Sequence, residues 1–234
     1  SVALLGPRKN IENMVKWFIE EFKDEDVGLI LKTGRSKGGP MDENATTSHL
    51  KKIVEGHKDR KCKVYLLHGD LEELEIQSLY LREDVHAYLS STHGEGYGLP
   101  VFEAAYSGLP IVATDWSAHT EFLSAPIKEG GKIKNKKLFA KVDYELKPIP
   151  KEVVWKDILI EGSQWAYPKE KSFKDQMRKV YKNHGMYKKW SASLMKHVVE
   201  NYTAENVVNL MKNKIFSIKD EVDPVPVDGI SFCI

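Results

Sequence analysis

Two glutamates near the middle of the chain have the spacing and surroundings of a site for a phosphorylated ligand. Glu95 lies in a glycine-rich loop, and Glu103 follows after seven intervening residues, inside a predicted helix. The loop glycines Gly96 and Gly98 let the backbone approach a ligand closely. The helix start offers a positive dipole and free N–H groups, which favour a phosphate, near Gly98, Leu99 and Val101.

Glu103 stands among mostly apolar residues, where a carboxylate is costly to bury without hydrogen-bond partners. The two hydroxyl groups of a ribose would supply such partners. Glu95, nearer the mouth of the loop, could reach hydroxyls of a sugar attached to the phosphate. The alternative is a solvent-facing Glu103 on an ordinary amphipathic helix. The glycine loop before it and Gly108-Leu109-Pro110 after it argue against that alternative.

Short β-rich runs and helical patterns alternate along the first two-thirds of the chain. This alternation predicts a Rossmann-like α/β fold, with a parallel sheet and helices on both faces. The predicted strands are Val2–Leu5, Val27–Thr33, Lys63–Leu67, Val85–Ser91 and Ile111–Thr114. The predicted helices are Ile11–Phe22 after the capping residue Asn10, Thr46 or Thr47 to Val54, Leu71–Arg82, Leu99–Ser107 and Ala118–Ser124. Ligands of such folds bind beyond the carboxyl ends of the strands.

The last third of the chain departs from this alternation. Lys128–Lys147 is first basic and then alternates apolar and polar residues, which predicts an edge strand or a flap. Helices are predicted at Lys169–Lys182, Tyr187–Tyr202 and Ala204–Ser217, the last capped by Thr203. We therefore expect a Rossmann-like domain at 1–167, C-terminal helices at 168–218 that pack on it or cross from it, and a loose tail at 219–234.

The composition of the chain limits the classes of function that it can have. The 234 residues are 41% apolar and 29% charged, and 35 Lys plus Arg against 34 Asp plus Glu give a net charge of +1. Such a balance gives no case for nucleic-acid binding. No run of about 18 uncharged apolar residues predicts a membrane span. Cys62 and Cys233 predict two free thiols in a reducing compartment, so the expected location is the cytoplasm.

The segment EGYGLPVFEAAYSGLPIVAT, which carries Glu95 and Glu103, resembles the signature of retaining GT-B glycosyltransferases of the GT4 type (glycosyl transferases group 1). PRKNI (Pro7–Ile11) resembles that family's basic turn after the first strand of its donor-binding half, and DWSAHTEFL (Asp115–Leu123) also resembles family members. The segments occur in the family's order, and the resemblance covers about Ser1–Leu123. It implies the C-terminal, donor-binding half of a GT-B fold.

The resemblance implies an enzyme that transfers a sugar from a UDP- or GDP-linked donor to a hydroxyl group of a glycan, lipid or protein. It implies retention at the anomeric carbon and no metal or cofactor. By the resemblance, Glu103 holds the ribose, Glu95 contacts donor-sugar hydroxyls near the reacting carbon, and Lys9 binds the diphosphate and stabilises the leaving group. The other expected donor-binding residues are Arg8, His93, Gly96, Tyr97, Gly98 and Leu99.

Two features depart from the family pattern. Leu4 stands where family members usually carry an arginine that grips the diphosphate, so either Arg8 substitutes for it or donor binding is weakened. The chain starts at Ser1, inside the first strand of the donor half. We therefore expect a processed or excised piece whose acceptor half is a further domain or a separate chain. The alternatives are an inert nucleotide-sugar-binding or assembly module of the same fold, and a nucleotide-sugar epimerase.

Other segments carry weaker signals. Gly34–Asn44 is predicted as a loop, and its part Gly34–Gly39 lacks the spacing of a phosphate-binding loop. This favours a mobile surface loop, with contact to the acceptor as the alternative. His68–Leu71, with Asp70, is expected to line the base pocket. A basic run predicts a solvated face, with contact to a phosphorylated or peripheral membrane-linked acceptor as the alternative: Lys132, Lys134, Lys136, Lys137 and Lys141.

Histidines and tryptophans near the predicted site have competing interpretations. His93 is either structural or a contact to the donor sugar or phosphate. His119, after the fifth predicted strand, is interpreted as structural. Trp155, Trp165 and Trp190 are expected to be packing residues that seat the C-terminal helices.

Overall fold

The structure, a computed structural model, describes residues 1–36 and 38–217. The chain divides into two compact units, which are described separately: Ser1–Val198 and the segment that begins at Val199. In the second unit, α8 (Ala204–Ser217) begins as predicted, and the Thr203 hydroxyl accepts a hydrogen bond from the Asn206 amide at 3.1 Å. Cys62 is a buried free thiol. The predicted tail at 219–234, which includes Cys233, lies outside the described residues.

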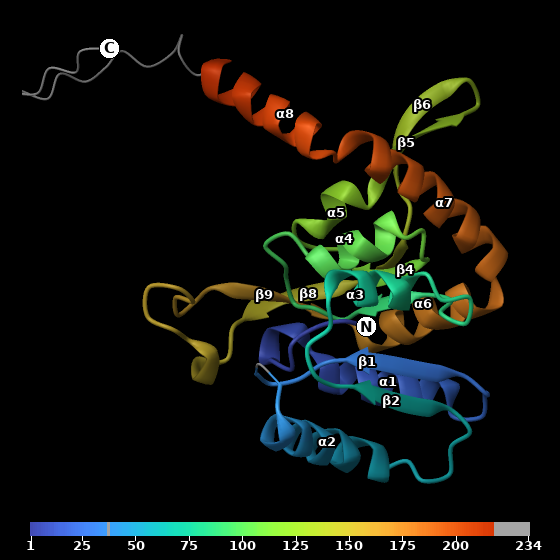
Figure 1. Cartoon of the computed structure of the whole chain (residues 1–234), viewed down its shortest axis with the longest axis vertical. Helices are drawn as coiled ribbons and strands as arrows, with labels where there is room; N and C mark the ends of the chain where they lie inside the picture. Colours follow the sequence, from blue (N-terminus) through green and yellow to red (C-terminus); the bar gives the residue numbers. More distant parts are fainter. Residues whose placement is uncertain (37, 218–234) are drawn as a thin grey trace, which may run out of the picture. The chain divides into compact units, whose positions relative to one another are not determined.

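Parallel strands form the centre of the first unit (Figure 1). β1 (Gly28–Lys32) pairs with β2 (Lys63–Leu67), and a second sheet has the order β3 (Tyr88–Ser90), β4 (Ile111–Thr114), β7 (Ala140–Val142). The helices are α1 (Ile11–Phe22), α2 (Pro40–Glu55), α3 (Glu73–Tyr80), α4 (Leu99–Tyr106), α5 (His119–Phe122), α6 (Glu170–Lys182) and α7 (His184–Asn201). The predicted α/β fold, with parallel strands and helices on both faces, is confirmed.

One hydrophobic core joins these elements. Helix α1 buries the residues that recur at helical spacing in its sequence, and it presents them to the sheet: Ile11, Met14, Val15, Phe18, Ile19 and Phe22. Helix α6 buries Phe173, Met177 and Val180 in the same core, beside the strand residues Leu31, Leu89 and Val112. This core holds the strands so that their carboxyl ends meet at one edge.

The predicted first strand, Val2–Leu5, is reduced to a single parallel bridge between Val2 and Lys32. Its backbone still runs beside β1, because the Ala3 amide donates to the Lys32 carbonyl and the Leu5 amide to the Gly34 carbonyl. On the side of β3, the segment bonds to the Tyr88 side chain instead of to backbone groups. A strand that lacks a backbone partner on one side does not form a full ladder.

The predicted loop Gly34–Asn44 is wrong over its second half, since α2 begins at Pro40. Proline suits the first turn of a helix, and Asp42 and Glu43 place negative charge at its positive end. Several other predicted elements are shorter than expected. Helix α3 covers Glu73–Tyr80, β3 covers Tyr88–Ser90, and α5 covers His119–Phe122 of the predicted Ala118–Ser124.

Two antiparallel hairpins interrupt the α/β alternation. β5 (Ser124–Glu129) and β6 (Lys132–Lys137) form one, and β8 (Tyr144–Pro148) and β9 (Gln164–Pro168) form the other. The basic run is thus divided between β6 and the edge strand β7. Lys136 pairs with Glu129 and lies over the Trp190 ring, whereas Lys137 pairs with Asp115. Short 3-10 helices occur at Pro7–Lys9 and Lys151–Val153.

Candidate functional site

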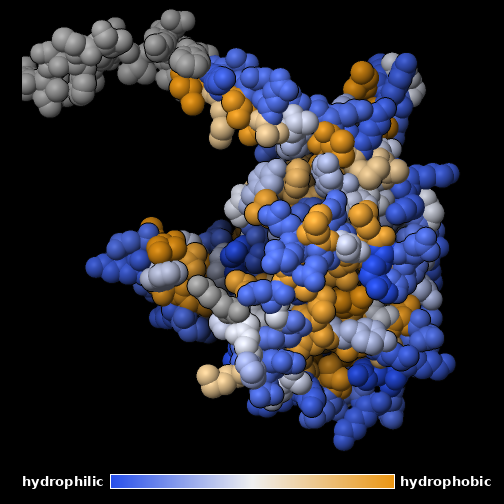
Figure 2. Space-filling model, in the orientation of Figure 1, coloured by the Kyte–Doolittle hydropathy of each residue, from blue (hydrophilic) through white to orange (hydrophobic). Residues whose placement is uncertain are grey.

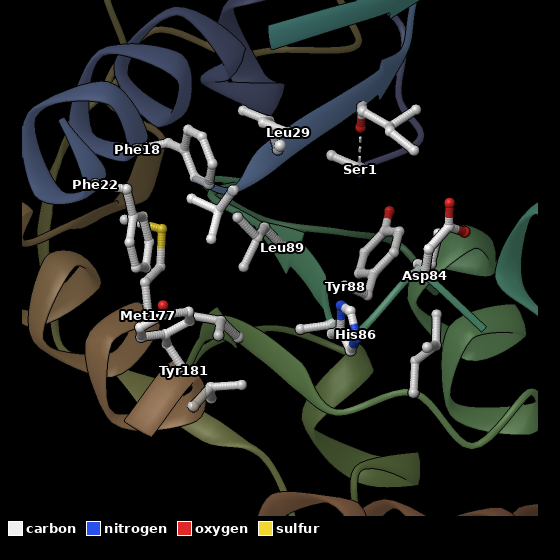
Figure 3. Close-up of a pocket in the computed structure, with 18 of the residues that line it drawn as sticks. Ser1, Phe18, Phe22, Leu29, Asp84, His86, Tyr88, Leu89, Met177 and Tyr181 are labelled. Atoms are coloured by element: carbon white, nitrogen blue, oxygen red, sulfur yellow. Dashed lines mark hydrogen bonds between the residues drawn. The ribbon is translucent and has the colours of Figure 1, made fainter. Parts of the chain in front are cut away.

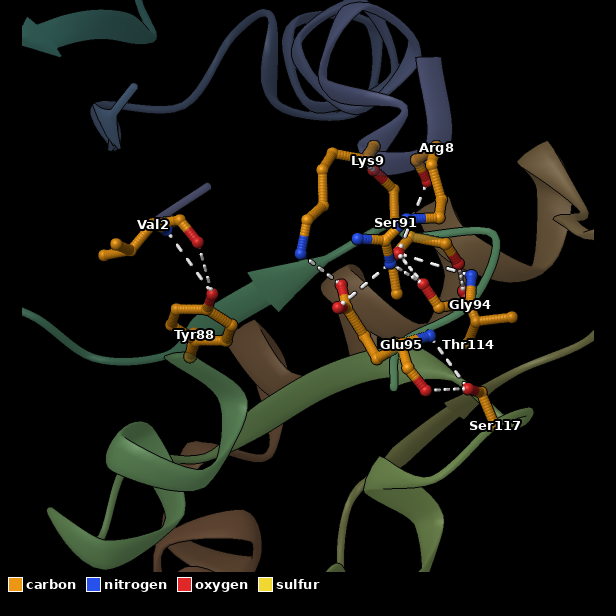
Figure 4. A network of polar contacts seen from close by, with 10 residues as sticks. Val2, Arg8, Lys9, Tyr88, Ser91, Gly94, Glu95, Thr114 and Ser117 are labelled. Carbon is orange, nitrogen blue, oxygen red and sulfur yellow. Dashed lines mark hydrogen bonds and ion pairs between the residues drawn. The ribbon is translucent and has the colours of Figure 1, made fainter. Parts of the chain in front are cut away.

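The basic turn, Pro7–Lys9, is fastened to the loop that follows β3. The His93 amide donates to the Arg8 carbonyl at 2.8 Å, and the Ser91 hydroxyl donates to the carbonyls of Lys9 and Asn10. These residues are more than eighty positions apart in the sequence, yet both segments leave the carboxyl edge of the parallel strands (Figure 4). The fold therefore brings the two strongest sequence motifs together.

Glu95 lies between the two cations of this turn. The Lys9 Nζ is 2.6 Å from Oε1 of Glu95, and the Arg8 guanidinium is 3.1 Å from Oε2 (Figure 4). Arg8 also donates to the Gly94 carbonyl. The Glu95 side chain is only 8% exposed, against 19% for Lys9 and 40% for Arg8. The cluster thus holds one buried carboxylate and two cations, of which Arg8 is the more open to solvent.

The pKa of Glu95 reflects a competition between burial and these cations. Burial by itself raises the pKa, but the hydrogen bond from Lys9 and the charges of Lys9 and Arg8 lower it below the ordinary value of 4.5. Glu95 is therefore ionised in the folded protein, and it compensates part of the positive charge that Lys9 and Arg8 present to the edge of the sheet.

Glu95 should make the stability of the protein depend on acid. Because its pKa is lower in the folded state, its stabilising contribution is complete above pH 4.5 and is lost as the pH falls through the lowered pKa. We expect the free energy of unfolding to fall less steeply below pH 4.5 in Glu95→Gln than in the unmodified protein, as measured by urea denaturation across that range. Equal slopes in the two proteins would contradict this assignment.

The backbone of Glu95 is held by Ser117. The Glu95 amide donates to the Ser117 hydroxyl at 2.8 Å, and that hydroxyl donates back to the Glu95 carbonyl. Ser117 has a φ of 86°, which is unusual for a residue other than glycine. Beyond its place in the segment Asp115–Leu123, Ser117 could not be recognised from the sequence, because its role depends on a backbone conformation that serine rarely adopts.

Helix α4 starts immediately after the loop, at Leu99. Gly98 has a φ of 88°, and a Cβ at this position would lie 3.2 Å from Cβ of His119, so glycine is required there. The expectation of a free N–H group at Val101 is wrong, because this amide donates to the Gly98 carbonyl at 2.9 Å. Gly96 and Leu99 are exposed. Among the described residues, no backbone carbonyl outside the helix accepts a hydrogen bond from the Leu99 amide.

Glu103 lies apart from the Arg8–Lys9–Glu95 cluster. It is half-buried, and its Oε2 accepts a hydrogen bond from the Tyr80 hydroxyl at 3.2 Å. Burial raises the pKa of Glu103, against the lowering effect of the Tyr80 hydrogen bond. The alternative of an ordinary solvent-facing glutamate is therefore wrong. The partner of its carboxylate in this structure is a phenol of α3.

A cavity of about 430 Å³ opens beside the basic turn. Arg8 and Lys9 form one wall, and Pro100, the residue one turn before Glu103, also lines it. The ends of β1 and β2, the loops after them and the start of α2 supply most of the other lining residues: Lys32, Thr33, Gly34, Ser36, Gly38, Asp42, His68, Gly69 and Asp70. Leu4, in the position of the family arginine, lines the cavity and is 63% exposed.

His68, in the loop after β2, is hydrogen-bonded to Asp42 of α2, a contact that the sequence does not signal. Nε2 of His68 is 2.8 Å from Oδ2 of Asp42, and both side chains are nearly buried. Asp42 also accepts the Arg35 amide at 3.1 Å. The pair connects the end of β2 to the start of α2. It therefore shapes the wall of the cavity where His68 and Asp70 lie.

His93 has the contacts of a structural residue. It is 6% exposed, its Nδ1 lies 3.1 Å from the Ala166 carbonyl, and its ring packs on Trp165 and Tyr167. Burial lowers the pKa of His93, so the neutral ring is favoured. Trp165 is therefore a packing residue, as expected, and it packs on the loop of Glu95.

The other aromatic and histidine candidates fall into three groups. Trp155 is 64% exposed, so the expectation of packing is wrong for it, whereas Trp190 contacts Tyr187 within α7. His119 is fully buried, with Nε2 at 2.8 Å from the Thr114 carbonyl, as a structural histidine would be. Tyr97 is exposed and its ring contacts Phe102 and Phe122.

Neither a metal centre nor a membrane helix is found in the part of the chain that the structure describes. Within residues 1–36 and 38–217, no three His, Cys, Asp or Glu side chains converge as a metal site would require. No helix in those ranges combines the length and the hydropathy that crossing a bilayer demands.

The chain is similar in fold to solved glycosyltransferase domains. The C-terminal domain of a glycosyl transferase group 1 family protein (LpcC) from Francisella tularensis gives a TM-score of 0.57 at 16% identity, over 87% of this chain and 85% of that chain. The catalytic domain of cholesterol-α-glucosyltransferase from Helicobacter pylori gives 0.54 at 16% identity, over 87% and 96%. No protein-family model and no curated protein sequence matches the chain.

A longer solved structure is matched over only part of its length. Anabaena Alr3699/HepE, solved in complex with UDP and glucose, gives a TM-score of 0.59 at 12% identity. The match covers 92% of this chain but 47% of HepE, so the chain spans about half the length of that protein. These likenesses show that the chain has the fold of a GT-B glycosyltransferase C-terminal domain.

Proposed function

We propose that the chain is the donor-binding half of a glycosyltransferase that takes a sugar from a UDP- or GDP-linked donor and passes it to a hydroxyl acceptor. The observation that carries the proposal is the Arg8–Lys9–Glu95 cluster, which borders a cavity of about 430 Å³ at the carboxyl edge of the sheet. A nucleotide diphosphate that leaves the sugar gains negative charge, and preorganised cations stabilise that charge.

In the proposed complex, the diphosphate lies against Lys9, Arg8 and the first amides of α4. The Leu99 amide is available at the positive end of that helix. The base would lie toward Asp70, across the same cavity. The hydroxyl groups of the ribose would replace the Tyr80 hydroxyl as the hydrogen-bond donors to the Glu103 carboxylate. The UDP and glucose bound in HepE support a UDP-sugar donor.

Finer features belong to the same proposal. Once ligand is bound, Glu95 would contact hydroxyls of the donor sugar, while Lys9 stabilises the departing diphosphate. We also propose the GT4 type, retention at the anomeric carbon, independence of metal and cofactor, a cytoplasmic location, and an acceptor half on a further domain or a separate chain.

Calorimetric titration tests donor binding directly. We expect UDP or GDP to bind the chain at least about tenfold more tightly than the matching nucleoside, because only the diphosphate meets the cations of the basic turn. Sugar-linked forms of the same nucleotide should bind at the same site and compete. Folded protein that gives no heat and no protection with any of these nucleotides would refute the proposal.

A second candidate, an inert nucleotide-sugar-binding module, is favoured by one observation. Leu4 gives the cavity an exposed apolar side chain, whereas an arginine at this position would add a further positive charge to those of Arg8 and Lys9. Turnover after an acceptor half is supplied, in cis or as a separate chain, separates the two candidates. Transfer that disappears in Glu95→Gln excludes the inert module, and nucleotide binding without any transfer favours it.

A further inference from the structure

Two features of the first unit lie outside the proposed donor site. One is an apolar groove of about 570 Å³, whose wall includes Phe18, Leu89 and Met177 (Figure 3). The parallel strands β1 and β3 bound this groove, so it belongs to the sheet layer described above. The other feature is the hairpin of β5 and β6, which lies outside the parallel strands and carries exposed charge.

The hairpin is a short, regular projection. Its strands are joined by a tight turn at Gly130 and Gly131, which have φ values of 57° and 79°. Positive φ at both central residues is typical of the two-residue turns that match the twist of a hairpin. In Figure 1 this end stands clear of the parallel strands, and Figure 2 shows hydrophilic side chains on it with a few hydrophobic ones between them.

The hairpin has a strong local excess of positive charge. Its two strands contain five lysines and one acidic residue, Glu129, which gives them a net charge of +4 in a chain whose total is +1. Lys136 is 2.7 Å from Glu129 and lies over the Trp190 ring, and Lys137 pairs with Asp115. These contacts fix the base of the hairpin on α7 and on the loop after β4.

The end of the hairpin keeps unpaired charge around an exposed apolar side chain. Lys128, Lys132 and Lys134 are exposed, and no carboxylate in the described part of the chain lies within ion-pair distance of them. Ile133, between Lys132 and Lys134, is 74% exposed, and its partner across the hairpin is Lys128. Three free cations therefore surround one exposed isoleucine.

These charges lie on both faces of the hairpin. Directly opposed residues of antiparallel strands share a face, and neighbours along a strand alternate between faces. Lys132 and Lys134 therefore lie on the face of Ile127, whereas Lys128 and Ile133 lie on the other face. A partner bound to one flat side would leave the lysines of the opposite side unused. The arrangement thus favours contact through the end of the hairpin, where both sets meet.

The types of side chain indicate a diffuse anionic surface and not a single bound anion. The hairpin contains no arginine, the residue that holds one phosphate or carboxylate through two parallel hydrogen bonds. Lysine acts as a mobile point charge on a flexible stem. Several lysines beside an exposed aliphatic side chain match a layer of anionic headgroups that covers an apolar interior.

We propose that the β5–β6 hairpin is a docking surface for an anionic lipid bilayer. Lys128, Lys132 and Lys134 contact the lipid phosphates, while Ile133 enters the boundary between headgroups and acyl chains. The paired base keeps the hairpin fixed to the first unit, so docking orients that unit on the bilayer. This contact requires neither a nucleotide donor nor an acceptor.

Vesicle flotation with the full chain tests the proposal. We expect the protein to float with phosphatidylcholine vesicles that contain about 30% phosphatidylglycerol, and not with phosphatidylcholine alone. Each lysine near an anionic surface strengthens binding by about fivefold. The triple variant Lys128→Gln/Lys132→Gln/Lys134→Gln should therefore lower the partition coefficient by at least about 50-fold.

Two further variants make the result specific. Lys51→Gln/Lys52→Gln/Lys58→Gln removes the same charge from three exposed lysines on and just after α2, and its partition coefficient should stay within about twofold of that of the unmodified chain. Ile133→Ser keeps every lysine and should lower the partition coefficient by about fivefold, because the apolar contact is lost.

Each other result overturns the proposal. Equal losses in the two triple variants would mean that net charge alone attracts the protein. Absence of flotation with the anionic vesicles, or equal flotation with phosphatidylcholine, would mean that the hairpin does not recognise anionic lipid. Saturable NMR shifts of hairpin amides with glycerol phosphate, without vesicle binding, would assign the hairpin to a soluble phosphorylated ligand. Nucleotide titration of the same variants reports on the cavity beside the basic turn, so docking and donor binding fail independently.

Discussion

Replacement of Lys9 by methionine is expected to weaken the binding of UDP or GDP by about 100-fold. The Lys9 side chain is 19% exposed, so its charge acts on a diphosphate through less water than a surface lysine would. In Lys9→Met, the ionised Glu95 also keeps only Arg8 as its partner and repels the ligand. Calorimetry at fixed ionic strength measures the loss.

The control for Lys9→Met separates affinity from stability. A buried carboxylate that loses a partner destabilises the fold, so Lys9→Met should also unfold at lower urea. Adding Glu95→Gln should recover stability, because the unpaired charge is gone, but should not recover affinity. Lys16→Met, on the exposed face of α1, should change neither property. Unchanged affinity in Lys9→Met would show that Lys9 does not contact the diphosphate.

The meeting of Arg8, Lys9 and Glu95 could be predicted from the sequence, because it depends on topology. Each residue closely follows a predicted strand, and parallel strands of one sheet end at the same edge. The structure brings the three side chains within hydrogen-bond distance, although the first predicted strand is reduced to a bridge. The parallel direction of the strands was therefore enough to predict that these three residues lie at the same edge of the sheet.

The position of Glu103 could not be predicted in the same way. Its neighbours in the sequence indicated a buried carboxylate, and in the structure Glu103 is half-buried. Its partner, Tyr80, comes from α3, and nothing in the spacing of either helix specifies how α3 and α4 meet. Side-chain partners between helices depend on packing angle, which a single sequence pattern does not encode.

An edge strand or flap was predicted at Lys128–Lys147, and the edge strand β7 lies there, but the pairing of the two hairpins could not be predicted. β6 is almost entirely exposed, and β8 is exposed except at its first residue, so neither strand carries the apolar alternation that marks a half-buried strand. β9 buries Trp165 and Ala166 next to each other, because the strand contacts the His93 loop. The packing of aromatic residues of β9 on His93 therefore could not be predicted from the local sequence pattern.

The packing of α6 on the sheet gives the largest expected effect on stability. Phe173 is fully buried and its ring centroid lies 5.5 Å from that of Trp17, so it joins α6 to α1. Phe173→Ala should lower the free energy of unfolding by about 3–5 kcal/mol, from lost burial and the cavity left behind. For a chain of this size, the thermal midpoint should fall by roughly 10 °C, as measured by calorimetry.

Two comparisons make the Phe173 result specific. Phe173→Leu keeps most of the buried volume and should cost much less, and Lys171→Ala, on the exposed side of the same helix, should leave the midpoint within about 2 °C. Helix α6 directly follows β9, and β9 holds the loop of Glu95 through His93. If α6 only rested on the sheet, its loss would lower the free energy of unfolding very little. A Phe173→Ala midpoint equal to that of Lys171→Ala would show that α6 is not part of the core.

Nucleotide affinity of the folded Phe173→Ala protein should stay unchanged, since Phe173 supports the scaffold and does not line the cavity beside Lys9.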